Sequence, residues 1–141
     1  MRYILFTFLL FTTLASAAQN TKATLSVKKK SAHVLRVRVV NGLSDPKTAG
    51  PVVVEVVEIY KSKTFSVGET FAVKMQPFSI TDDSAQVSHL AKGNELIVFL
   101  SKDDPKSFSL NGSSYSYFAL YDDWLGWMFY NEAEGELLKQ K

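Results

Sequence analysis

The chain has 141 residues, 46% of them apolar and 21% charged, which suits one globular domain. Sixteen basic against 14 acidic side chains give a net charge of +2, and this argues against nucleic-acid binding, which needs a concentrated basic surface. The absence of cysteine excludes disulfides, thiol nucleophiles and lipid attachment through a cysteine, so stability must come from burial.

The first 17 residues have the order of a secretory signal peptide. Arg2 supplies a positive charge, Ile4–Leu14 is an apolar run, and Ala15-Ser16-Ala17 matches the small-x-small cleavage pattern. The run is too short to cross a bilayer, which takes about 20 residues. We therefore expect cleavage after Ala17 or Ala18, no later transmembrane segment, and a mature protein in the periplasm or outside the cell. An exported chain without disulfides favours a bacterial source.

The next segments predict a flexible stretch and then a strand. Residues 18–31 are expected to be a flexible N-terminal segment, with at most a short strand at Leu25–Val27 before the triplet Lys28–Lys30. From Val34 to Val40, apolar residues alternate with two arginines, the period-two pattern of a strand with one buried and one wet face.

A second strand is expected after a loop. Asn41–Pro51 is rich in glycine and proline and predicts the loop, while Val52–Tyr60 is largely β-branched and predicts the strand. Glu55 and Glu58 have opposite parity within it. A β-bulge between them would bring both carboxylates to the same side.

The middle of the chain predicts a hairpin and a buried strand. Thr70–Met75 is a strand that follows the connection Lys61–Gly68, and Pro77–Ala91 is a loop or one short helix. After a turn at Lys92–Asn94, Glu95–Leu100 is apolar on both parities and is expected to be a central strand buried on both faces.

The last third predicts a hairpin and a helix. Phe108–Leu110 and Ser114–Leu120 flank Asn111-Gly112, a dipeptide typical of tight hairpin turns. Glu132–Lys141 begins with acids and ends with lysines, the order that the helix dipole favours.

These elements predict an all-β domain over residues 32–141. Five or six twisted strands without intervening helices favour a small OB-like barrel with a short C-terminal helix, because closure removes exposed edges. A β-sandwich is the alternative.

Three stretches carry a resemblance to a known family: Val54–Lys61, Val67–Val73 and Leu90–Leu100. They resemble the strand, the "V-G-D-T" hairpin and the "L-x-K-G-x-x-Y-L-V-F-L" strand of netrin-type, metalloproteinase-inhibitor-like (NTR-type) OB domains, including cysteine-less bacterial exported relatives. The resemblance covers roughly residues 32–130 and implies the barrel fold. The animal inhibitors chelate protease zinc through an N-terminal cysteine, which this chain lacks, so that activity is not carried over.

No residue pattern predicts a catalytic or metal centre. His33 and His89 are the two side chains suited to acid–base chemistry at neutral pH, and neither lies in a zinc-protease, nucleophile-elbow or P-loop motif. A hydrolase built on His89 is a minor alternative. We expect no catalytic residue, metal or cofactor. Three acidic pairs in expected turns lack the order of a calcium loop and are taken as solvated: Asp82-Asp83, Asp103-Asp104 and Asp122-Asp123.

The least ordinary stretch is Tyr115–Tyr130, which holds eight aromatics in sixteen residues. One interpretation is that its large side chains fill the open end of the barrel under the terminal helix: Phe118, Leu120, Trp124, Trp127 and Phe129. The other is that part of the segment binds a partner, since Trp and Tyr concentrate in such surfaces. The candidate binding residues are Trp124, Trp127, Tyr130, Tyr121, Asp122 and Asp123.

These observations lead to two functional hypotheses. The first is a non-enzymatic exported domain that binds a protein through the aromatic C-terminal segment. The alternative is a carbohydrate-binding or saccharide-active domain that uses the same aromatics on an envelope glycan. Charge is also uneven, because residues 22–47 are basic and residues 103–136 are acidic. The two segments are expected to neutralise each other, or else Arg36, Arg38 and the lysine triplet meet anionic polymers or lipid headgroups.

Overall fold

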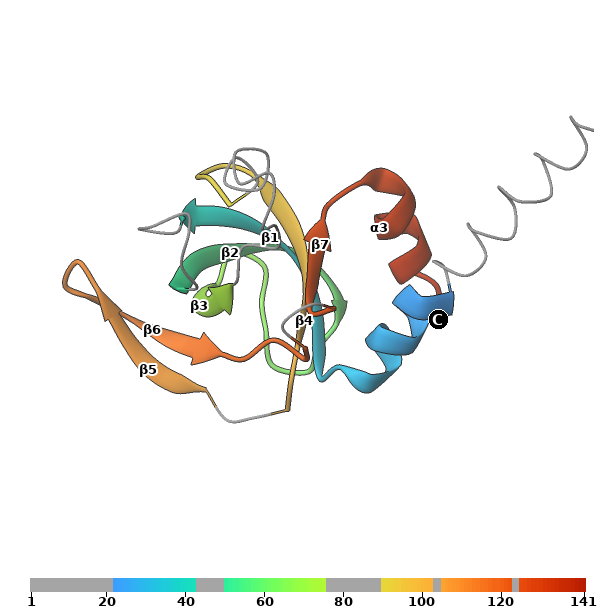
Figure 1. Cartoon of the computed structure of the whole chain (residues 1–141), viewed down its shortest axis with the longest axis horizontal. Coiled ribbons are helices and arrows are strands. Elements are labelled where there is room, and N and C mark those ends of the chain that lie inside the picture. The colour runs from blue at the N-terminus through green and yellow to red at the C-terminus, as the bar shows by residue number, and fades with distance from the viewer. Residues whose placement is uncertain (1–21, 43–49, 76–89, 103–104, 123–124) are drawn as a thin grey trace, which may run out of the picture.

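The computed structural model describes residues 22–42, 50–75, 90–102, 105–122 and 125–141 (Figure 1). Within these ranges the chain forms seven strands and two short helices. Residues 22–30 form the first helix. The other elements are β1 (His33–Asn41), β2 (Gly50–Lys61), β3 (Thr70–Met75), β4 (Glu95–Leu100), β5 (Lys106–Leu110), β6 (Ser113–Phe118), β7 (Trp127–Phe129) and α3 (Glu132–Leu138).

The strands form one mixed sheet in the order β5-β6-β3-β2-β1-β4-β7, in which the β3–β6 pair is parallel. The expected all-β class with a small C-terminal helix is confirmed. The described strands belong to a single sheet, unlike the two sheets of the alternative sandwich. Their number exceeds the expected five or six because β7 adds a short edge strand beside β4.

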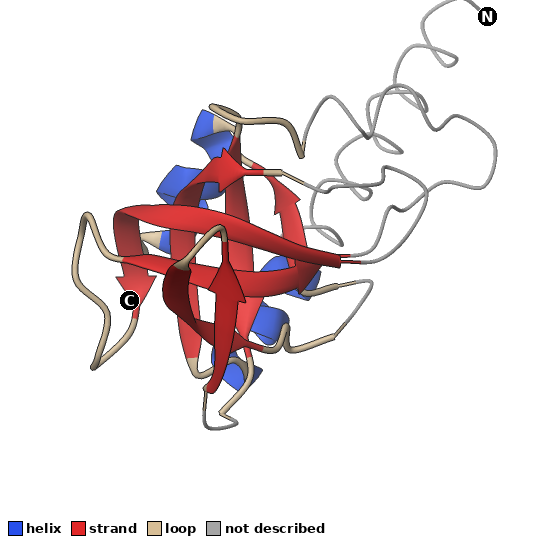
Figure 2. Ribbon diagram, turned by 90° about the vertical axis from the view of Figure 1, so that its left-hand side faces the viewer, coloured by secondary structure: helices blue, strands red, loops and turns tan. Residues whose placement is uncertain are grey.

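The sheet is strongly curved but is not a closed barrel (Figure 2). After β6 the chain reaches β4 through one isolated antiparallel bridge between Leu100 and Leu120. Tyr121 N–H also donates to the Phe99 carbonyl at 2.7 Å. The β5–β6 hairpin diverges from the sheet (Figure 1), so a continuous ladder does not develop at this point. The sheet therefore curls back on itself without closing, and the OB-like detail of the expected barrel stays a prediction.

The β-bulge expected in the second strand is present. In the ladder between β1 and β2, Arg36 lies opposite Glu58 and Arg38 lies opposite Glu55, with a register shift between Arg36 and Val37. Three steps along β2 thus match two steps along β1, which is the geometry of a bulge. Both carboxylates consequently lie on the face that carries the two arginines.

Alternate residues of β4 enter two different apolar clusters, so its expected burial on both faces is confirmed. The main core, inside the curve of the sheet, receives Leu96, Val98 and Leu100. An outer cluster receives Ile97 and Phe99, which pack with Val34 of β1 and Leu138 of α3. The strand is interior but second from the end of the sheet, between β1 and β7, and not at its centre.

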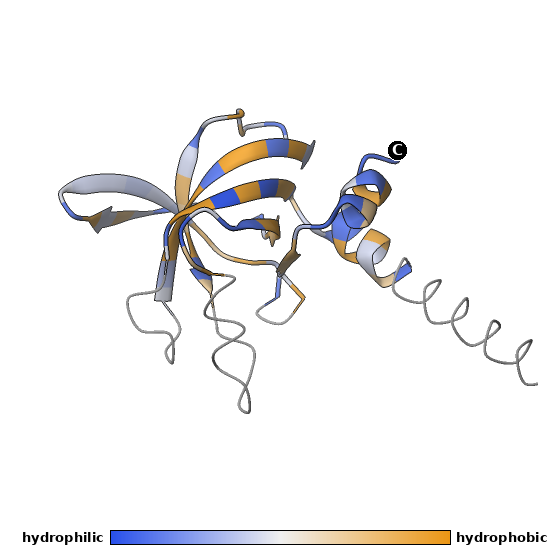
Figure 3. Cartoon of the chain, turned by 90° about the horizontal axis from the view of Figure 1, so that it is seen from above, coloured by the Kyte–Doolittle hydropathy of each residue, from blue (hydrophilic) through white to orange (hydrophobic). Residues whose placement is uncertain are grey.

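The two helices lie side by side on the outer face, at one end of the molecule (Figures 1 and 3). The expected short strand at Leu25–Val27 is wrong, because residues 22–30 are helical. Lys28 Nζ donates to the carbonyls of Leu138 and Gln140, at 2.7 and 2.8 Å. Carbonyls at the end of a helix have no partner within it, so this lysine from one helix caps the other.

The turns follow the residue types that the sequence supplies. Asn111 and Gly112 have φ angles of 50° and 81°, which a primed two-residue hairpin turn requires. Asn131 caps α3 by accepting from the Glu134 N–H at 2.9 Å, and the helix ends at Leu138, before the expected end at Lys141.

Two earlier expectations lie largely or wholly outside the described residues. They are the signal peptide at 1–17 and most of the expected loop or helix at Pro77–Ala91. In the part of the chain that is described, neither helix has the length and apolarity needed to cross a bilayer.

Leu138→Ala tests whether the outer cluster stabilises the fold. Leu138 is fully buried against β4, and its truncation should lower the free energy of unfolding by about 2–5 kcal/mol. The adjacent Leu137 is half-buried, so Leu137→Ala is the matched control and should cost about 1 kcal/mol. Urea unfolding followed by circular dichroism measures both. Equal losses would show that α3 contributes little to the packing of the sheet.

Candidate functional site

The aromatic C-terminal segment is divided between the interior and the surface. Trp127 is 4% exposed and belongs to the main core together with Leu120, while Phe118 packs against that core. The Trp127 and Phe129 rings meet edge to face at 5.3 Å. Trp127, a predicted binding residue, therefore has little surface to offer a ligand, and its position matches the core-filling interpretation.

Three of the other candidate residues are described, and all three are partly buried: Tyr121, Asp122 and Tyr130. Tyr121 and Tyr130 are partly buried and pack against the outer cluster. Asp122 Oδ1 accepts from the Leu125 N–H at 3.0 Å, which fixes a turn before β7. Trp124 and Asp123 lie outside the described residues.

Two apolar side chains of this segment are exposed although the binding set did not include them. Leu125 is 58% exposed and Phe129 is 39% exposed. Sequence reasoning assigned Phe129 to the core and did not consider Leu125. The position of Leu125 between an aspartate pair and a glycine indicates a turn, which was the available signal for its exposure. We call Leu125 and Phe129 the C-terminal apolar pair.

The arginines of β1 are neutralised within the fold. Arg36 Nε donates to Glu95 Oε2 at 3.0 Å, and Arg36 Nη1 lies 3.5 Å from Glu58 Oε2. Arg38 reaches the other oxygen of Glu95 at 3.4 Å. The partners come from β2 and β4, not from the acidic segment 103–136. The arginines therefore do not present the free basic face that the sequence suggested.

An aromatic contact attaches α3 to this charged cluster. The Arg36 guanidinium lies 3.6 Å from the centre of the Tyr130 ring, a cation–π distance. Burial, aided by Glu58, raises the pKa of Tyr60, so its phenol stays protonated. A Cβ at Gly135 would lie 3.0 Å from the Tyr130 ring and 3.1 Å from Tyr60 Oη, so glycine permits the close approach of α3. This arrangement packs α3 against the sheet, and we do not consider it a ligand site.

His33 forms the one histidine–serine contact found among the described residues. Its Nδ1 lies 2.9 Å from Ser62 Oγ. That oxygen also accepts the N–H groups of Thr64 and Phe65, at 3.2 and 3.1 Å. Both lone pairs are thereby engaged, so the hydroxyl proton goes to Nδ1. An oxygen held in this way stabilises a turn and is a poor nucleophile.

A cleft of about 830 Å³ opens beside His33, and its rim is basic. Lys61, Lys63 and Lys102 line it together with the hydroxyl-bearing Ser62 and Thr64, and none of the lining residues that the structure describes is acidic.

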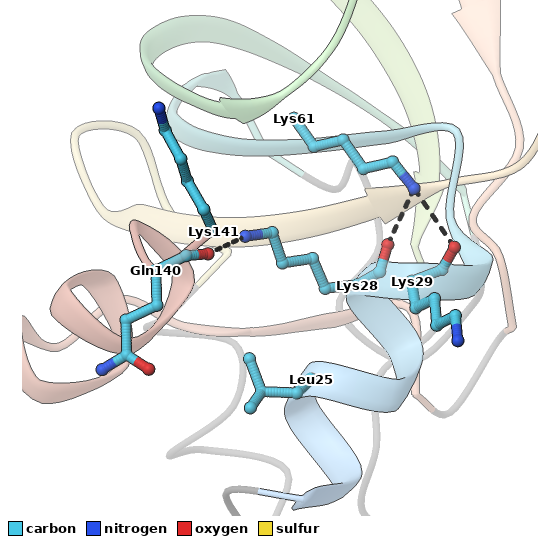
Figure 4. A pocket seen from close by; sticks show the side chains of 6 residues that line it. All are labelled: Leu25, Lys28, Lys29, Lys61, Gln140 and Lys141. Carbon is cyan, nitrogen blue, oxygen red and sulfur yellow. Dashed lines mark hydrogen bonds between the residues drawn. The ribbon is translucent and has the colours of Figure 1, made fainter.

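A second cleft of about 390 Å³ lies between the helix of residues 22–30 and the residues after α3 (Figure 4). It is lined by Leu25, Lys28, Lys29, Lys61, Gln140 and Lys141. Lys61 lines both clefts. Its Nζ donates to the carbonyls of Lys28 and Lys29, at 3.1 and 3.2 Å, and to that of Ser31. Sequence reasoning noted the lysine triplet but could not bring Lys61, Lys63, Lys102 and Lys141 to it. We call the cleft beside His33 and the cleft beside the first helix together the lysine clefts.

Among the described residues, no three histidine, aspartate or glutamate side chains converge as a metal site would require. Comparison of the sequence with models of protein families and with curated proteins finds no match. The candidate sites of this chain thus rest on its own geometry, and the two that remain are the C-terminal apolar pair and the lysine clefts.

His33→Gln tests the environment of the imidazole. Burial, and then the neighbouring Lys61, lower the pKa of His33, so the folded state binds fewer protons than the unfolded state below pH 6.5. The contribution of His33 to stability is complete above that pH and is lost as the pH falls through the folded-state pKa. The wild type should therefore lose more unfolding free energy than His33→Gln between pH 7 and pH 5.

Urea unfolding at half-unit pH steps measures this difference. From pH 7 to 8 both proteins hold a neutral side chain at this position, so their curves should run parallel there and serve as the internal control. Parallel curves over the whole range would show that the folded and unfolded pKa values are alike.

Proposed function

We propose that this chain is an exported, non-enzymatic binding domain whose protein partner contacts the C-terminal apolar pair. The supporting observation is the exposure of Leu125 and Phe129 within five residues of each other, next to the buried Trp127. Exposed apolar residues beside a rigid aromatic core are typical of interaction surfaces. The resemblance to NTR-type OB domains stays a prediction and is compatible with this role.

The charges around the pair define the chemistry of the partner. Asp122 precedes Leu125, and the exposed Glu132 opens α3 shortly after Phe129. Lysine and arginine on a partner would complement these carboxylates, and like charges would be repelled. The surface therefore fits a protein with an apolar patch and a basic rim.

The buried Trp127 gives no support to the saccharide alternative. Stacking on a sugar needs a flat ring that reaches solvent, and Trp127 is 4% exposed, whereas Phe129, which was not in the predicted binding set, is 39% exposed. Asp122, which was to bond sugar hydroxyls, holds the Leu125 N–H instead. An enzymatic role based on His33 would need a nucleophile with a free lone pair, which Ser62 does not provide.

Export is tested by the amino terminus of the mature protein. The full chain, expressed in a Gram-negative host, should appear in the periplasm or medium and begin at residue 18 or 19, because Ala15-Ser16-Ala17 forms the expected cleavage site. Ala15→Arg in the same host is the matched variant and should leave the precursor uncleaved. Edman sequencing or intact mass measures both. An uncleaved wild-type chain in the cytoplasm would contradict export.

Binding is tested by removing the apolar pair from the surface. The double variant Leu125→Ser/Phe129→Ser should lose at least about ten-fold in affinity for the partner, because a central apolar contact is typically worth 1–2 kcal/mol or more. Val67 is 65% exposed in the β2–β3 connection, so Val67→Ser is a control of equal chemistry at another place.

The partner is first isolated by cross-linking the tagged wild type in its export compartment and is identified by mass spectrometry. Its affinity for the purified variants is then measured by calorimetry, with melting curves to confirm that all of them fold. Retention of the same partner at full affinity by the double variant would contradict the assignment of this surface.

A further inference from the structure

We infer that the lysine clefts bind an anion that carries several phosphate groups. This site is separate from the C-terminal apolar pair and does not rest on the proposed protein partner. Its basis is a set of six lysines around two adjoining hollows whose described lining residues include no acid: Lys28, Lys29, Lys61, Lys63, Lys102 and Lys141.

Two of these lysines are structural. Lys61 donates its three N–H groups to the carbonyls of residues 28, 29 and 31. Lys28 donates two to the carbonyls of Leu138, the last residue of α3, and Gln140 (Figure 4). Their side chains are thereby ordered, and each still carries its full positive charge. Lys61 lines both clefts and Lys28 lines the smaller one, so a ligand need not order these two side chains on binding.

The other four lysines have no structural task. Lys29, Lys63, Lys102 and Lys141 are exposed, and their ammonium groups form no hydrogen bond or ion pair in the described part of the chain. By contrast, the basic residues on the neighbouring outer face are matched by acids. Arg36 and Arg38 pair with Glu58 and Glu95, and Lys139 pairs with Glu58 and Glu136. Six lysines therefore gather around the two clefts without an ion-pair partner among the described residues, although the chain carries only +2 overall.

The donor types favour phosphate. Lysine ammonium groups act as point charges that suit phosphate oxygens, and no arginine fork for planar carboxylates lines either cleft. The hydroxyl of Thr64, which also lines the larger cleft, adds a hydrogen-bonding group beside the lysines. Because Lys61 lines both hollows, a ligand with phosphates at intervals can occupy them together, with Lys63 and Lys102 on one side and Lys29 and Lys141 on the other.

Such phosphates can come from a soluble oligophosphate or from a lipid headgroup. The recessed shape of the clefts admits both, since a headgroup can enter while its chains remain in a membrane. The shared chemistry is the phosphate group, and the two sources are separated by the arms of the experiment.

The experiment measures binding of inorganic tripolyphosphate to residues 18–141 by isothermal calorimetry at low ionic strength. The double variant Lys63→Gln/Lys102→Gln removes two unengaged charges and leaves both helix-capping lysines intact. Its affinity should fall at least about ten-fold, which corresponds to the loss of charge-assisted contacts. Lys29→Gln/Lys141→Gln should act similarly from the second cleft.

The matched control is Lys74→Gln/Lys92→Gln. Both residues are exposed, one on β3 and the other in the turn before β4, and neither lines a cleft. The control removes the same charge, so an equal loss of affinity in the control would overturn the site and leave only a non-specific charge effect. Melting curves of all variants should coincide, because none of the four cleft substitutions removes a structural contact.

Two further arms define the ligand. Citrate, a multivalent carboxylate, should bind more weakly than tripolyphosphate at the same concentration, and equal binding would overturn the choice of phosphate.

Cosedimentation with phosphatidylglycerol vesicles, compared with phosphatidylcholine vesicles, tests the lipid source. Loss of cosedimentation in the Lys63/Lys102 variant would support a lipid headgroup as the ligand. Absence of binding in both the tripolyphosphate and the vesicle arms would overturn the proposal. The Leu125/Phe129 variant should bind phosphate normally, which separates this test from that of the protein partner.

Discussion

The structure depends on the burial of both faces of β4. A strand with one wet face would need only the main core, but Ile97 and Phe99 point away from that core and are fully buried on the outer side. Leaving two such side chains in water would forgo roughly 1.5–3 kcal/mol for each. The outer face must therefore be covered, and α3 and the helix of residues 22–30 lie over it.

Covering the sheet with two short helices creates a second requirement. Helices of seven and nine residues are marginal in isolation, and their last carbonyl groups lack partners within the helix. Lys61 satisfies the end of one helix and Lys28 the end of the other. The same two residues thus serve the fold and draw positive charge to one end of the molecule. The basic character of the clefts begins as a consequence of how the helices are capped.

The sequence allowed β1 to β6 to be predicted because each of them carries a short-range signal, whereas β7 was not expected. Alternation marked β1, β-branched residues marked β2, and Asn111-Gly112 marked the last hairpin. The bulge could also be foreseen, since Glu55 and Glu58 would otherwise lie on opposite faces. The extent to which the sheet closes could not be predicted, because it depends on how far the β5–β6 hairpin diverges from the sheet. No local sequence pattern encodes that divergence.

The first helix was missed because its buried positions are polar. Thr24 and Ser31 are buried, with the half-buried Leu25, Val27 and Lys28 between them, so the helical spacing is present. A search that counts only apolar residues finds Leu25 and Val27 on the buried face of this helix and overlooks the polar residues beside them. For the same reason the lysine clefts could not be predicted, since they join residues that are 113 positions apart, from Lys28 to Lys141, across a helix that was not expected.

The aromatic segment shows why composition alone could not assign a surface. Trp127 and Phe129 have the same parity on β7, and they lie opposite Val98 and Leu96, which are both in the main core. Parity therefore predicts burial for both, yet Trp127 is 4% exposed and Phe129 is 39% exposed. β7 is a three-residue edge strand with a neighbour on one side only, so its last residue receives less cover.

The two candidate surfaces, the C-terminal apolar pair and the lysine clefts, differ in the charge of the residues near them. The acidic residues around the C-terminal apolar pair repel phosphate, and the lysines around the clefts repel a basic partner. The two ligands that we propose, a protein with a basic rim and a phosphate-bearing anion, differ in charge, so each would select one of the two surfaces.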